Sequence, residues 1–256
     1  MYFHRKVGWP VQNEYTYTDM LAYFGVTTAH PGGKNITARA IDLLPIVNGM
    51  KIAELGCGLG DTAHFLATEK GANVYGIDVH PVMIQKARER HKDAFDRKKL
   101  HFLHTDAASI PFPDESIDGI IAESVLSFSN VHDVLKECRR LLRPGGFFAS
   151  LDLVCDPAFP IVEKKEYSSF YGMKQLYTMN EWHDLLKSYN MHVQHTIEEN
   201  PANLPAGDIP ELLLSDDVPL KCYEIMENHI TMLEKNQPFT RYAYFICKKD
   251  DQMNLI

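Results

Sequence analysis

Three features of the sequence predict an α/β fold in which a mostly parallel sheet carries helices on both faces. Strand-like apolar runs alternate with helix-like runs from residue 36 to residue 151, which is typical of strand–helix–strand units. A glycine turn, Gly56-Cys-Gly58-Leu-Gly60, follows the first strand-like run, and Asp78 ends the second. The 256 residues suffice for one large domain with an elaboration, which buries about three quarters of the unfolded chain's surface.

The first helix and the first strand precede the glycine turn. Five apolar residues have the spacing of one helical face: Ile36, Ala40, Leu43, Leu44 and Val47. The strand is expected near residues 51–55. After the turn, a helix should run from about Thr62 to Lys70 and end at Gly71, since glycine commonly follows helix C-termini.

The second strand is expected at about residues 73–77. Pro81 then suits the first turn of a helix, where its missing N–H leaves no hydrogen bond unmade. Three residues form the buried side of that helix: Met83, Ile84 and Ala87. Residues 100–104 form the third predicted strand.

The fourth strand, about residues 117–122, is almost continuously apolar, which indicates burial on both faces. The helix after it places six residues on one face: Val131, Val134, Leu135, Cys138, Leu141 and Leu142. We expect this helix to end at the Arg-Pro-Gly-Gly turn of residues 143–146, and the fifth strand to cover residues 147–151.

The rest of the chain is less regular. A tyrosine-rich stretch follows the fifth strand, and then come a short helix at about residues 182–189 and a strand at about residues 191–197. The last strand is expected at residues 241–247. Residues 199–238 form an insertion before it, in which residues 220–233 have the length and apolar spacing of a lid helix.

The composition is that of a soluble enzyme. The formal net charge of -8 argues against a nucleic-acid groove. One basic cluster is interleaved with acidic residues, as on a solvated helix face: Lys86, Arg88, Arg90, Lys92, Arg97, Lys98 and Lys99. There is no apolar run of the roughly twenty residues that a membrane span needs, and no signal-peptide core.

The five cysteines lack the spacing of a disulfide framework or of a metal site. We therefore expect a reduced, cytoplasmic protein without a metal site.

The glycine turn and Asp78 together indicate a nucleoside-containing cofactor. Glycines allow the turn and let a ligand approach the main chain, and a carboxylate can accept both hydroxyls of a ribose. Dinucleotide sites prefer G-x-G-x-x-G, but here the third glycine comes one residue early and Asp61 takes the sixth position. A carboxylate there would repel a pyrophosphate at the helix N-terminus. A dinucleotide site remains the alternative.

The spelling Glu54-Leu-Gly56-Cys-Gly58-Leu-Gly60 resembles motif I of the class I S-adenosyl-L-methionine-dependent methyltransferases. Two later segments, residues 104–119 and 141–147, look like the family's "gDa..lPfpd..FD" and "LkPGG" elements. The likeness is strongest to the group that includes the ubiquinone and menaquinone C-methyltransferases. It implies a seven-stranded Rossmann-like sheet of order 3-2-1-4-5-7-6 with strand 7 antiparallel.

As domain organisation, we expect a single methyltransferase domain over residues 1–256. It divides into an N-terminal cap segment, residues 1–34, a cofactor-binding core, residues 35–155, and a C-terminal part, residues 156–256, which contains the lid-like insertion.

The resemblance implies a site for S-adenosyl-L-methionine and its product S-adenosyl-L-homocysteine. Glu54 and the backbone around Gly56 and Gly58 would hold the methionine ammonium and carboxylate. Asp78 would take the ribose hydroxyls, with Val79 beside the adenine.

The resemblance also implies that Met83 packs on the adenine face, although a methionine on a helix's inner stripe is often plain core. Asp106 and Ala107 match the pair that reads the adenine amino group and ring nitrogen. Glu123 would line the sulfonium end; the alternative is an exposed carboxylate at a strand end.

Residues 29–37 resemble an N-terminal "HPGG...T" element of some of these enzymes. Its turn could close over the methionine carboxylate, with His30 or Thr37 adding a side-chain donor. A plain loop with an N-cap before the next helix is the alternative.

Methyl transfer needs alignment of the acceptor with the methyl group more than it needs a protein nucleophile or a metal. The acceptor is expected to be a small molecule that reacts through O, N, S or C, with no nucleic acid and no membrane as partner. Asp152, at the end of strand five, is the candidate to orient an amine or take a proton, and Tyr17 is the second acceptor-side candidate. A surplus of aromatic residues surrounds the expected acceptor site: Tyr15, Tyr17, Tyr23, Phe24, Phe128, His132, Tyr167, Phe170, Tyr171 and Tyr177. A second function class stays open: a regulatory or interaction protein of the same fold that binds the cofactor without catalysis.

Overall fold

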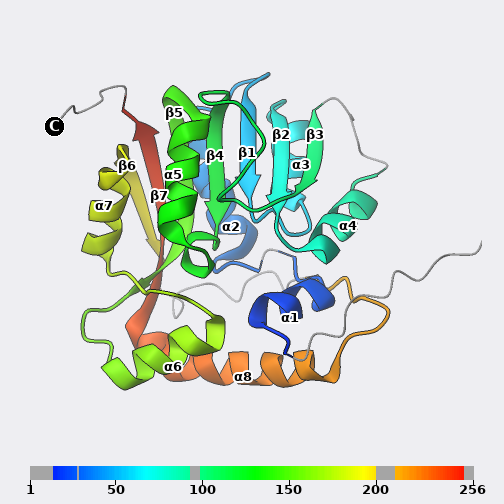
Figure 1. The fold of residues 1–256 in the computed structure, drawn as a ribbon, viewed down its shortest axis with the longest axis vertical. Coiled ribbons are helices and arrows are strands. Elements are labelled where there is room, and N and C mark those ends of the chain that lie inside the picture. Colours follow the sequence, from blue (N-terminus) through cyan, green and yellow to red (C-terminus); the bar gives the residue numbers. More distant parts are fainter. Residues whose placement is uncertain (1–13, 28, 93–98, 200–210, 251–256) are drawn as a thin grey trace, which may run out of the picture.

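The computed structural model describes residues 14–27, 29–92, 99–199 and 211–250. Its centre is a seven-stranded sheet of order β3-β2-β1-β4-β5-β7-β6, as predicted (Figure 1). The strands are β1 Lys51–Leu55, β2 Asn73–Asp78, β3 Leu100–His104, β4 Ile117–Glu123, β5 Leu142–Cys155, β6 Met191–Glu199 and β7 Thr240–Lys249. β7 is antiparallel to both of its neighbours, whereas β1 to β5 pair in parallel. The predicted fold class is therefore confirmed.

Helices cover both faces of the sheet and its lower edge in Figure 1. They are α1 Tyr17–Phe24, α2 Gly33–Leu43, α3 Asp61–Thr68, α4 Pro81–Arg90, α5 Val131–Leu141, α6 Ile161–Tyr171, α7 Met179–Ser188 and α8 Leu220–Asn236, with short 3₁₀ turns η1 Leu126–Phe128 and η3 Gln237–Phe239. Side chains of α2, α3 and α4 share one apolar cluster with one face of the sheet. Those of α5 and α7 share another cluster with the opposite face. None of the helices in the described ranges is long and apolar enough to cross a membrane.

Most predicted elements are confirmed to within a few residues. β4 is buried along nearly its whole length, as its apolar run indicated. Pro81 occupies the first turn of α4, whose residues Met83, Ile84 and Ala87 are buried. The six-residue apolar face predicted for α5 is also buried, with Leu142 just beyond its end.

Two residues of the first predicted stripe do not join the core. Leu43 is 49% exposed and Val47 is 60% exposed. α2 ends at Leu43, and Leu44 is already extended with φ -81° and ψ 141°. The helical spacing therefore stops before Val47, although Leu44 itself is buried.

β5 and α6 differ from the sequence prediction. The Arg-Pro-Gly-Gly segment, residues 143–146, belongs to β5, which extends beyond the expected residues 147–151 in both directions. The tyrosine-rich stretch, which lacks a regular apolar pattern, contains α6. Its hydrophobic residues do not form a one-sided stripe, since Ile161 and Val162 are exposed while Tyr167 and Tyr171 are buried.

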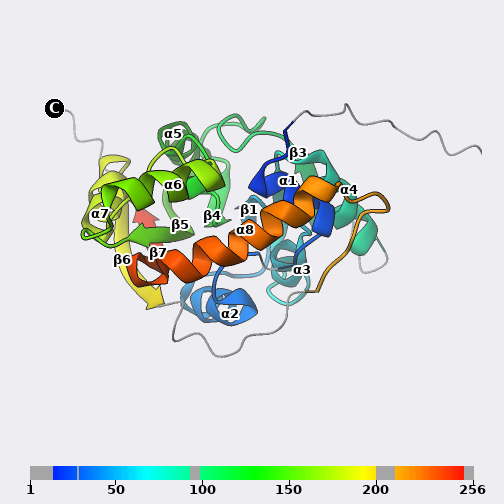
Figure 2. The same ribbon diagram turned by 90° about the horizontal axis from the view of Figure 1, so that it is seen from below.

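α1, α6 and α8 lie across the carboxyl ends of the parallel strands (Figures 1 and 2). Seen from below, α8 crosses the molecule with α1 and α6 beside it. We call these three helices the lid. Most of their buried side chains belong to the same apolar cluster as α2 and α3, and Ala22 of α1 packs with Leu59 and Met83, so the lid packs on the core. The predicted lid helix at residues 220–233 corresponds to α8.

One residue of the basic cluster, Lys86, holds the lid helix α1 to the core. The ammonium of Lys86, on α4, donates to the carbonyl oxygens of Ala22 (2.9 Å) and Tyr23 (3.2 Å), at the end of α1. Arg88 donates to the Phe102 carbonyl oxygen (2.7 Å). The expected solvated face is wrong for Lys86, whereas Arg88 is exposed as predicted. Arg97 and Lys98 lie outside the described residues.

Candidate active site

The glycine turn between β1 and α3 forms the floor of the site. Gly56, Gly58 and Gly60 have φ of 61°, 51° and 77°, values that side chains resist. A Cβ on Gly56 would lie 2.4 Å from Val125, and one on Gly60 would lie 2.5 Å from the Phe102 ring. Gly58 instead faces open space. A ligand can therefore approach the main chain at Gly58.

Asp78, at the end of β2, lies beside this turn. Its Oδ2 accepts a hydrogen bond from the Gly58 N–H (2.9 Å), and its Oδ1 accepts one from the His80 N–H (2.8 Å). Burial raises the pKa of the carboxyl, and the two backbone donors oppose that shift. The carboxylate is thus held in one orientation and still lines the cavity described below.

Glu54, in β1, is a buried carboxylate that lacks a full set of partners. Among the described residues, its Oε2 makes no hydrogen bond. Burial, followed by the charge of Glu123, raises its pKa well above the usual range. A buried polar atom of this kind needs a partner, and an ammonium group would supply three donors and an opposite charge.

Glu123, at the end of β4, is held by the segment before α2. Its Oε1 accepts a hydrogen bond from Thr37 Oγ1 (2.7 Å), and its Oε2 lies 3.5 Å from His30 Nε2. Thr37 Oγ1 and His30 Nε2 are themselves 3.3 Å apart. The Glu123 side chain is only 7% exposed, so the alternative of an exposed carboxylate does not hold. The next residue, Ser124, has φ 57°, a strained value of the kind that clusters at functional sites.

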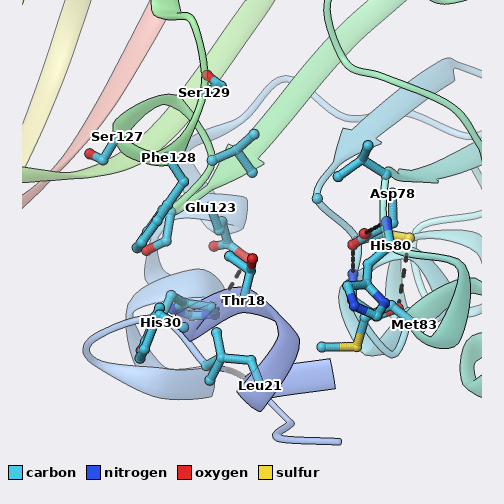
Figure 3. A pocket seen from close by; sticks show the side chains of 18 of the residues that line it. Thr18, Leu21, His30, Asp78, His80, Met83, Glu123, Ser127, Phe128 and Ser129 are labelled. Atoms are coloured by element: carbon cyan, nitrogen blue, oxygen red, sulfur yellow. Dashed lines mark hydrogen bonds and ion pairs between the residues drawn. The ribbon is translucent and has the colours of Figure 1, made fainter. Parts of the chain in front are cut away.

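These residues surround a cavity of about 930 Å³ between the sheet and the lid, at the upper end of the range for small-molecule sites. In Figure 3, His30 and Glu123 lie on one side of the pocket, and Asp78, His80 and Met83 lie on the other. Six carboxylates line it: Glu54, Asp61, Asp78, Asp106, Glu123 and Asp133. Within the described ranges no lysine or arginine lines it. The cavity therefore favours a cation over a phosphate.

The residues expected around an adenine also line the cavity. Val79 is 66% exposed, whereas Met83 is 7% exposed and packs in a small cluster with Leu59. Asp106 Oδ1 accepts a hydrogen bond from the Ala108 N–H (2.8 Å). With Ala107 beside it, this loop after β3 forms part of the cavity wall.

The lid side of the cavity is aromatic. The Tyr17 ring stacks on Phe128, with centroids 5.8 Å apart and planes 14° apart, and packs edge-on against Tyr171 at 4.8 Å. The Tyr171 hydroxyl is 2.8 Å from Nδ1 of His229, on α8. Burial lowers the pKa of His229 to about 4, so its ring is neutral at pH 7. Of the predicted aromatic residues, four line the cavity: Tyr17, Phe128, Tyr167 and Tyr171.

His229 is a functional candidate that the sequence analysis missed. A signal was present, because Cys222, Met226 and His229 follow a helical spacing in the predicted lid helix, and a histidine on such an apolar stripe is unusual. Tyr242, in β7, was also missed. It pairs with Leu153 of β5, beyond the point where β4 ends at Glu123 opposite Leu151, and so it reaches the cavity.

Asp152 does not line the cavity. It is completely buried in β5, and its Oδ1 accepts hydrogen bonds from the N–H and the hydroxyl of Ser127, both at 3.2 Å. Burial raises its pKa to about 7. Ser127 does line the cavity (Figure 3). Asp152 therefore lies behind Ser127, and direct contact with an acceptor does not fit this placement.

Asp61 is paired with Arg90 and His91, so its negative charge is partly neutralised and opposes a pyrophosphate less than an unpaired carboxylate would. Its Oδ1 accepts a hydrogen bond from Arg90 Nε (2.7 Å) and lies 3.4 Å from His91 Nε2. Burial by itself raises its pKa, but the hydrogen bonds from His91 and Arg90 outweigh this and lower it. The acidity that opposes a phosphate therefore comes mainly from Glu54, Asp78 and Glu123. Over the described residues, no group of three or more potential metal ligands is found.

Comparison with known proteins gives a consistent family. Residues 53–150 match the methyltransferase domain family. The chain is 29% identical over 236 residues to an uncharacterized methyltransferase, YodH, of Bacillus subtilis, covering 91% of this chain and 99% of that protein. It is 32% identical over 124 residues to 27-O-demethylrifamycin SV methyltransferase of Amycolatopsis mediterranei, covering 48% and 46%. Among solved structures, Haemonchus contortus phosphoethanolamine N-methyltransferase 2 in complex with S-adenosyl-L-methionine superimposes with a TM-score of 0.72 at 20% identity, covering 94% of this chain and 59% of that one.

Proposed function

We propose, from the premise that the chain is a class I S-adenosylmethionine-dependent methyltransferase, that it methylates a small molecule bound in the cavity between the sheet and the lid. The acceptor atom, O, N, S or C, forms a bond to the methyl carbon, and the electron pair of the broken carbon–sulfur bond stays on sulfur. The sequence resemblance to the ubiquinone and menaquinone C-methyltransferases keeps carbon among the acceptor atoms to be tested.

The observation that carries this proposal is the unpartnered Oε2 of Glu54 in a cavity lined by carboxylates. Cofactor and protein match in charge, because S-adenosylmethionine carries an ammonium and a sulfonium and no phosphate. A dinucleotide would bring a pyrophosphate to a turn where no lysine or arginine of the described residues lines the cavity. The negatively charged acceptor groups of the site thus fit the cationic S-adenosylmethionine and not the anionic NAD.

We assign roles by position. Glu54 and the backbone at Gly56 and Gly58 hold the methionine end. Asp78 holds the ribose hydroxyls, and the pair of hydrogen bonds from Gly58 and His80 fixes its orientation.

The adenine is held by four residues that line the cavity: Val79, Met83, Asp106 and Ala107. Glu123, oriented by His30 and Thr37, supplies negative charge at the sulfonium end.

On the acceptor side the protein contributes alignment and exclusion of water. Tyr17 is a wall of the acceptor space, supported by Phe128 and Tyr171. Asp152 is a positioning residue, which fixes the Ser127 N–H and hydroxyl from behind. Alignment of this kind can lower a barrier by roughly 7 to 11 kcal/mol, so no covalent step on the protein is needed.

The test is incubation of the purified chain with methyl-labelled S-adenosylmethionine and a metabolite library. We expect label in a small-molecule product and formation of S-adenosylhomocysteine in equal amount. The Glu54→Gln variant should lose most of this activity, because it removes the carboxylate assigned to the ammonium. Binding of S-adenosylhomocysteine without transfer to any library member would instead favour a non-catalytic cofactor-binding protein.

A further inference from the structure

The lid half of the cavity differs in charge from the cofactor half. Lining residues on α1, α6 and α8 include Tyr17, Met20, Tyr167, Tyr171, Met226 and Leu233. None of the lining residues that these three helices contribute is charged. The carboxylates of the cavity all belong to the core: Glu54, Asp78 and Glu123 lie in strands, Asp106 lies in a loop, and Asp61 and Asp133 lie in the first turns of α3 and α5. The space next to the lid is therefore aromatic, apolar and uncharged.

This lack of charge restricts the acceptor. A phosphate or carboxylate buried against these rings would lose its hydration and find no cation, and an ammonium would find no carboxylate on the lid. An uncharged ring or chain loses little on transfer to such a space, and aromatic walls pack well against it. The lid half therefore selects an acceptor without a phosphate, carboxylate or ammonium group.

One polar pair interrupts this apolar surface. The Tyr171 hydroxyl and His229 Nδ1 are 2.8 Å apart, and the His229 ring centroid is 5.0 Å from that of Tyr17. The second ring nitrogen, His229 Nε2, has no hydrogen-bond partner among the described residues. When Nδ1 carries the proton and donates to the Tyr171 oxygen, Nε2 is an acceptor for a hydroxyl donor.

From this arrangement we infer that the acceptor is an uncharged, mainly apolar molecule with a phenol or enol hydroxyl, and that His229, oriented by Tyr171, accepts the hydrogen bond and then the proton of that hydroxyl. The inference rests on the proposed function, because it concerns the acceptor half of the same cavity.

The proton and electron balance is complete without a further reactant. The hydroxyl oxygen uses a lone pair to bond the methyl carbon, the carbon–sulfur electron pair goes to sulfur, and the hydroxyl proton moves to His229 Nε2. The products are the methyl ether and S-adenosylhomocysteine. One positive charge disappears from sulfur as one appears on His229, so the net charge of the cavity does not change. The proton then passes to solvent as the products leave.

The first test is a binding measurement on the S-adenosylhomocysteine-loaded protein. The probes are 1-naphthol, 4-methylumbelliferone and estradiol, each compared with its phosphate ester and its methyl ether by calorimetry. We expect at least one free phenol to bind at least tenfold more tightly than both of its derivatives. The inference is overturned if a phosphate ester binds as well as its phenol or better, or if none of the phenols binds.

The second test uses variants with the best-binding phenol. We expect His229→Gln to lower kcat by about 100-fold or more, as for loss of a general base, and to flatten the pH profile of kcat. Tyr171→Phe should give a smaller loss. S-adenosylhomocysteine affinity should stay within twofold of wild type in both variants. Unchanged kcat and pH profile in His229→Gln would overturn the role of His229.

The matched control is His132→Gln. His132 Nδ1 lies 3.0 Å from the Tyr189 hydroxyl, which makes it a second histidine–tyrosine pair, and neither residue lines the cavity. This variant should keep wild-type kcat. If the wild-type protein fails to bind S-adenosylhomocysteine, the proposed function itself fails. If it binds that product but prefers a charged acceptor, only the present inference fails.

Discussion

Three buried carboxylates near the carboxyl ends of the strands differ in their partners, and these partners determine what each can do. Asp78 is held by two backbone donors and still lines the cavity. Glu54 lines the cavity with one oxygen unpartnered. Asp152 does not line the cavity; its Oδ1 binds Ser127, which does, and its Oδ2 has no hydrogen-bond partner among the described residues. Two of the three can therefore touch a ligand, and the third can act only through Ser127.

Asp78→Ala should weaken S-adenosylhomocysteine binding by roughly 10- to 150-fold, which corresponds to about 1.5 to 3 kcal/mol for hydrogen bonds to a charged group. Calorimetric titration measures it. The control is Asp118→Ala, which removes a carboxylate that accepts the Lys51 N–H (2.7 Å) outside the cavity. Asp118→Ala should leave that affinity unchanged. Wild-type affinity in Asp78→Ala would show that Asp78 does not hold the ribose.

Asp152 predicts a pH dependence of stability. Its pKa is raised from 3.8 to about 7 by burial, so the unfolded chain loses this proton at lower pH than the folded protein does. The contribution to the free energy of unfolding is complete below pH 3.8 and declines until about pH 7, by at most roughly 4 kcal/mol. Asp152→Asn cannot ionise. Its stability relative to wild type should therefore rise between pH 4 and pH 8 in denaturant titrations. An equal difference at both pH values would contradict the burial argument.

At the scale of elements, the glycine turn predicts a contrast between two substitutions. Ala at Gly56 meets Val125 at 2.4 Å, whereas Ala at Gly58 meets nothing within 4 Å, and both positions have positive φ. Gly56→Ala should lower the melting temperature much more than Gly58→Ala does. Gly58→Ala should fold and yet weaken S-adenosylhomocysteine binding, because its methyl group enters the cavity. Calorimetric melting and titration of both variants test this, and equal melting temperatures would contradict the assigned packing.

An ion pair joins the lid helix α1 to the cavity wall that carries Asp78. Asp19 Oδ1 lies 3.2 Å from Nε2 of His80, whose backbone N–H binds Asp78. Burial raises the pKa of Asp19, but hydrogen bonds from His80 and Thr16 outweigh this and bring it to about 2. Asp19 is thus ionised at any pH above that value, and the pair links the lid to Asp78, the carboxylate that we propose holds the ribose.

Asp19→Ala should therefore weaken S-adenosylhomocysteine binding several-fold, because the lid loses its contact with His80. Asp19 also completes the capping box of α1 with Thr16, and Glu181 completes that of α7 with Thr178. Glu181→Ala removes the same kind of cap, of roughly 0.5 to 2 kcal/mol, away from the cavity. Both variants should melt earlier, but only Asp19→Ala should change the affinity. If both variants bind S-adenosylhomocysteine equally well, the Asp19–His80 ion pair does not contribute to binding.

Sequence reasoning predicted the core elements better than the lid. β1 to β4 follow from short apolar runs, because a strand covered on both faces needs apolar residues throughout. α6 was missed because its buried residues are tyrosines without a periodic apolar stripe. Asp152 was expected at the acceptor because strand position alone does not tell which way a side chain points at the end of a strand. His229 was missed because its role depends on a tyrosine 58 residues away.

In the whole molecule, the order of the strands determines where the cavity lies, and the lid gives the cavity an uncharged half beside its acidic half. β1 and β4 are neighbours although α3, β2, α4 and β3 separate them in sequence. Ligands in open α/β sheets bind at such a crossover, beyond the carboxyl ends of the strands. The core contributes carboxylates that suit a cationic cofactor, and the lid contributes uncharged aromatic residues that suit an apolar acceptor.

The central claim is that this cavity binds S-adenosylmethionine and its product. Calorimetric titration of the full chain with S-adenosylhomocysteine, with NAD in a parallel experiment, tests it most directly. We predict saturable binding of one S-adenosylhomocysteine per chain and no heat with NAD, because lining carboxylates oppose a pyrophosphate. Saturable binding of NAD without a signal from S-adenosylhomocysteine would contradict the account.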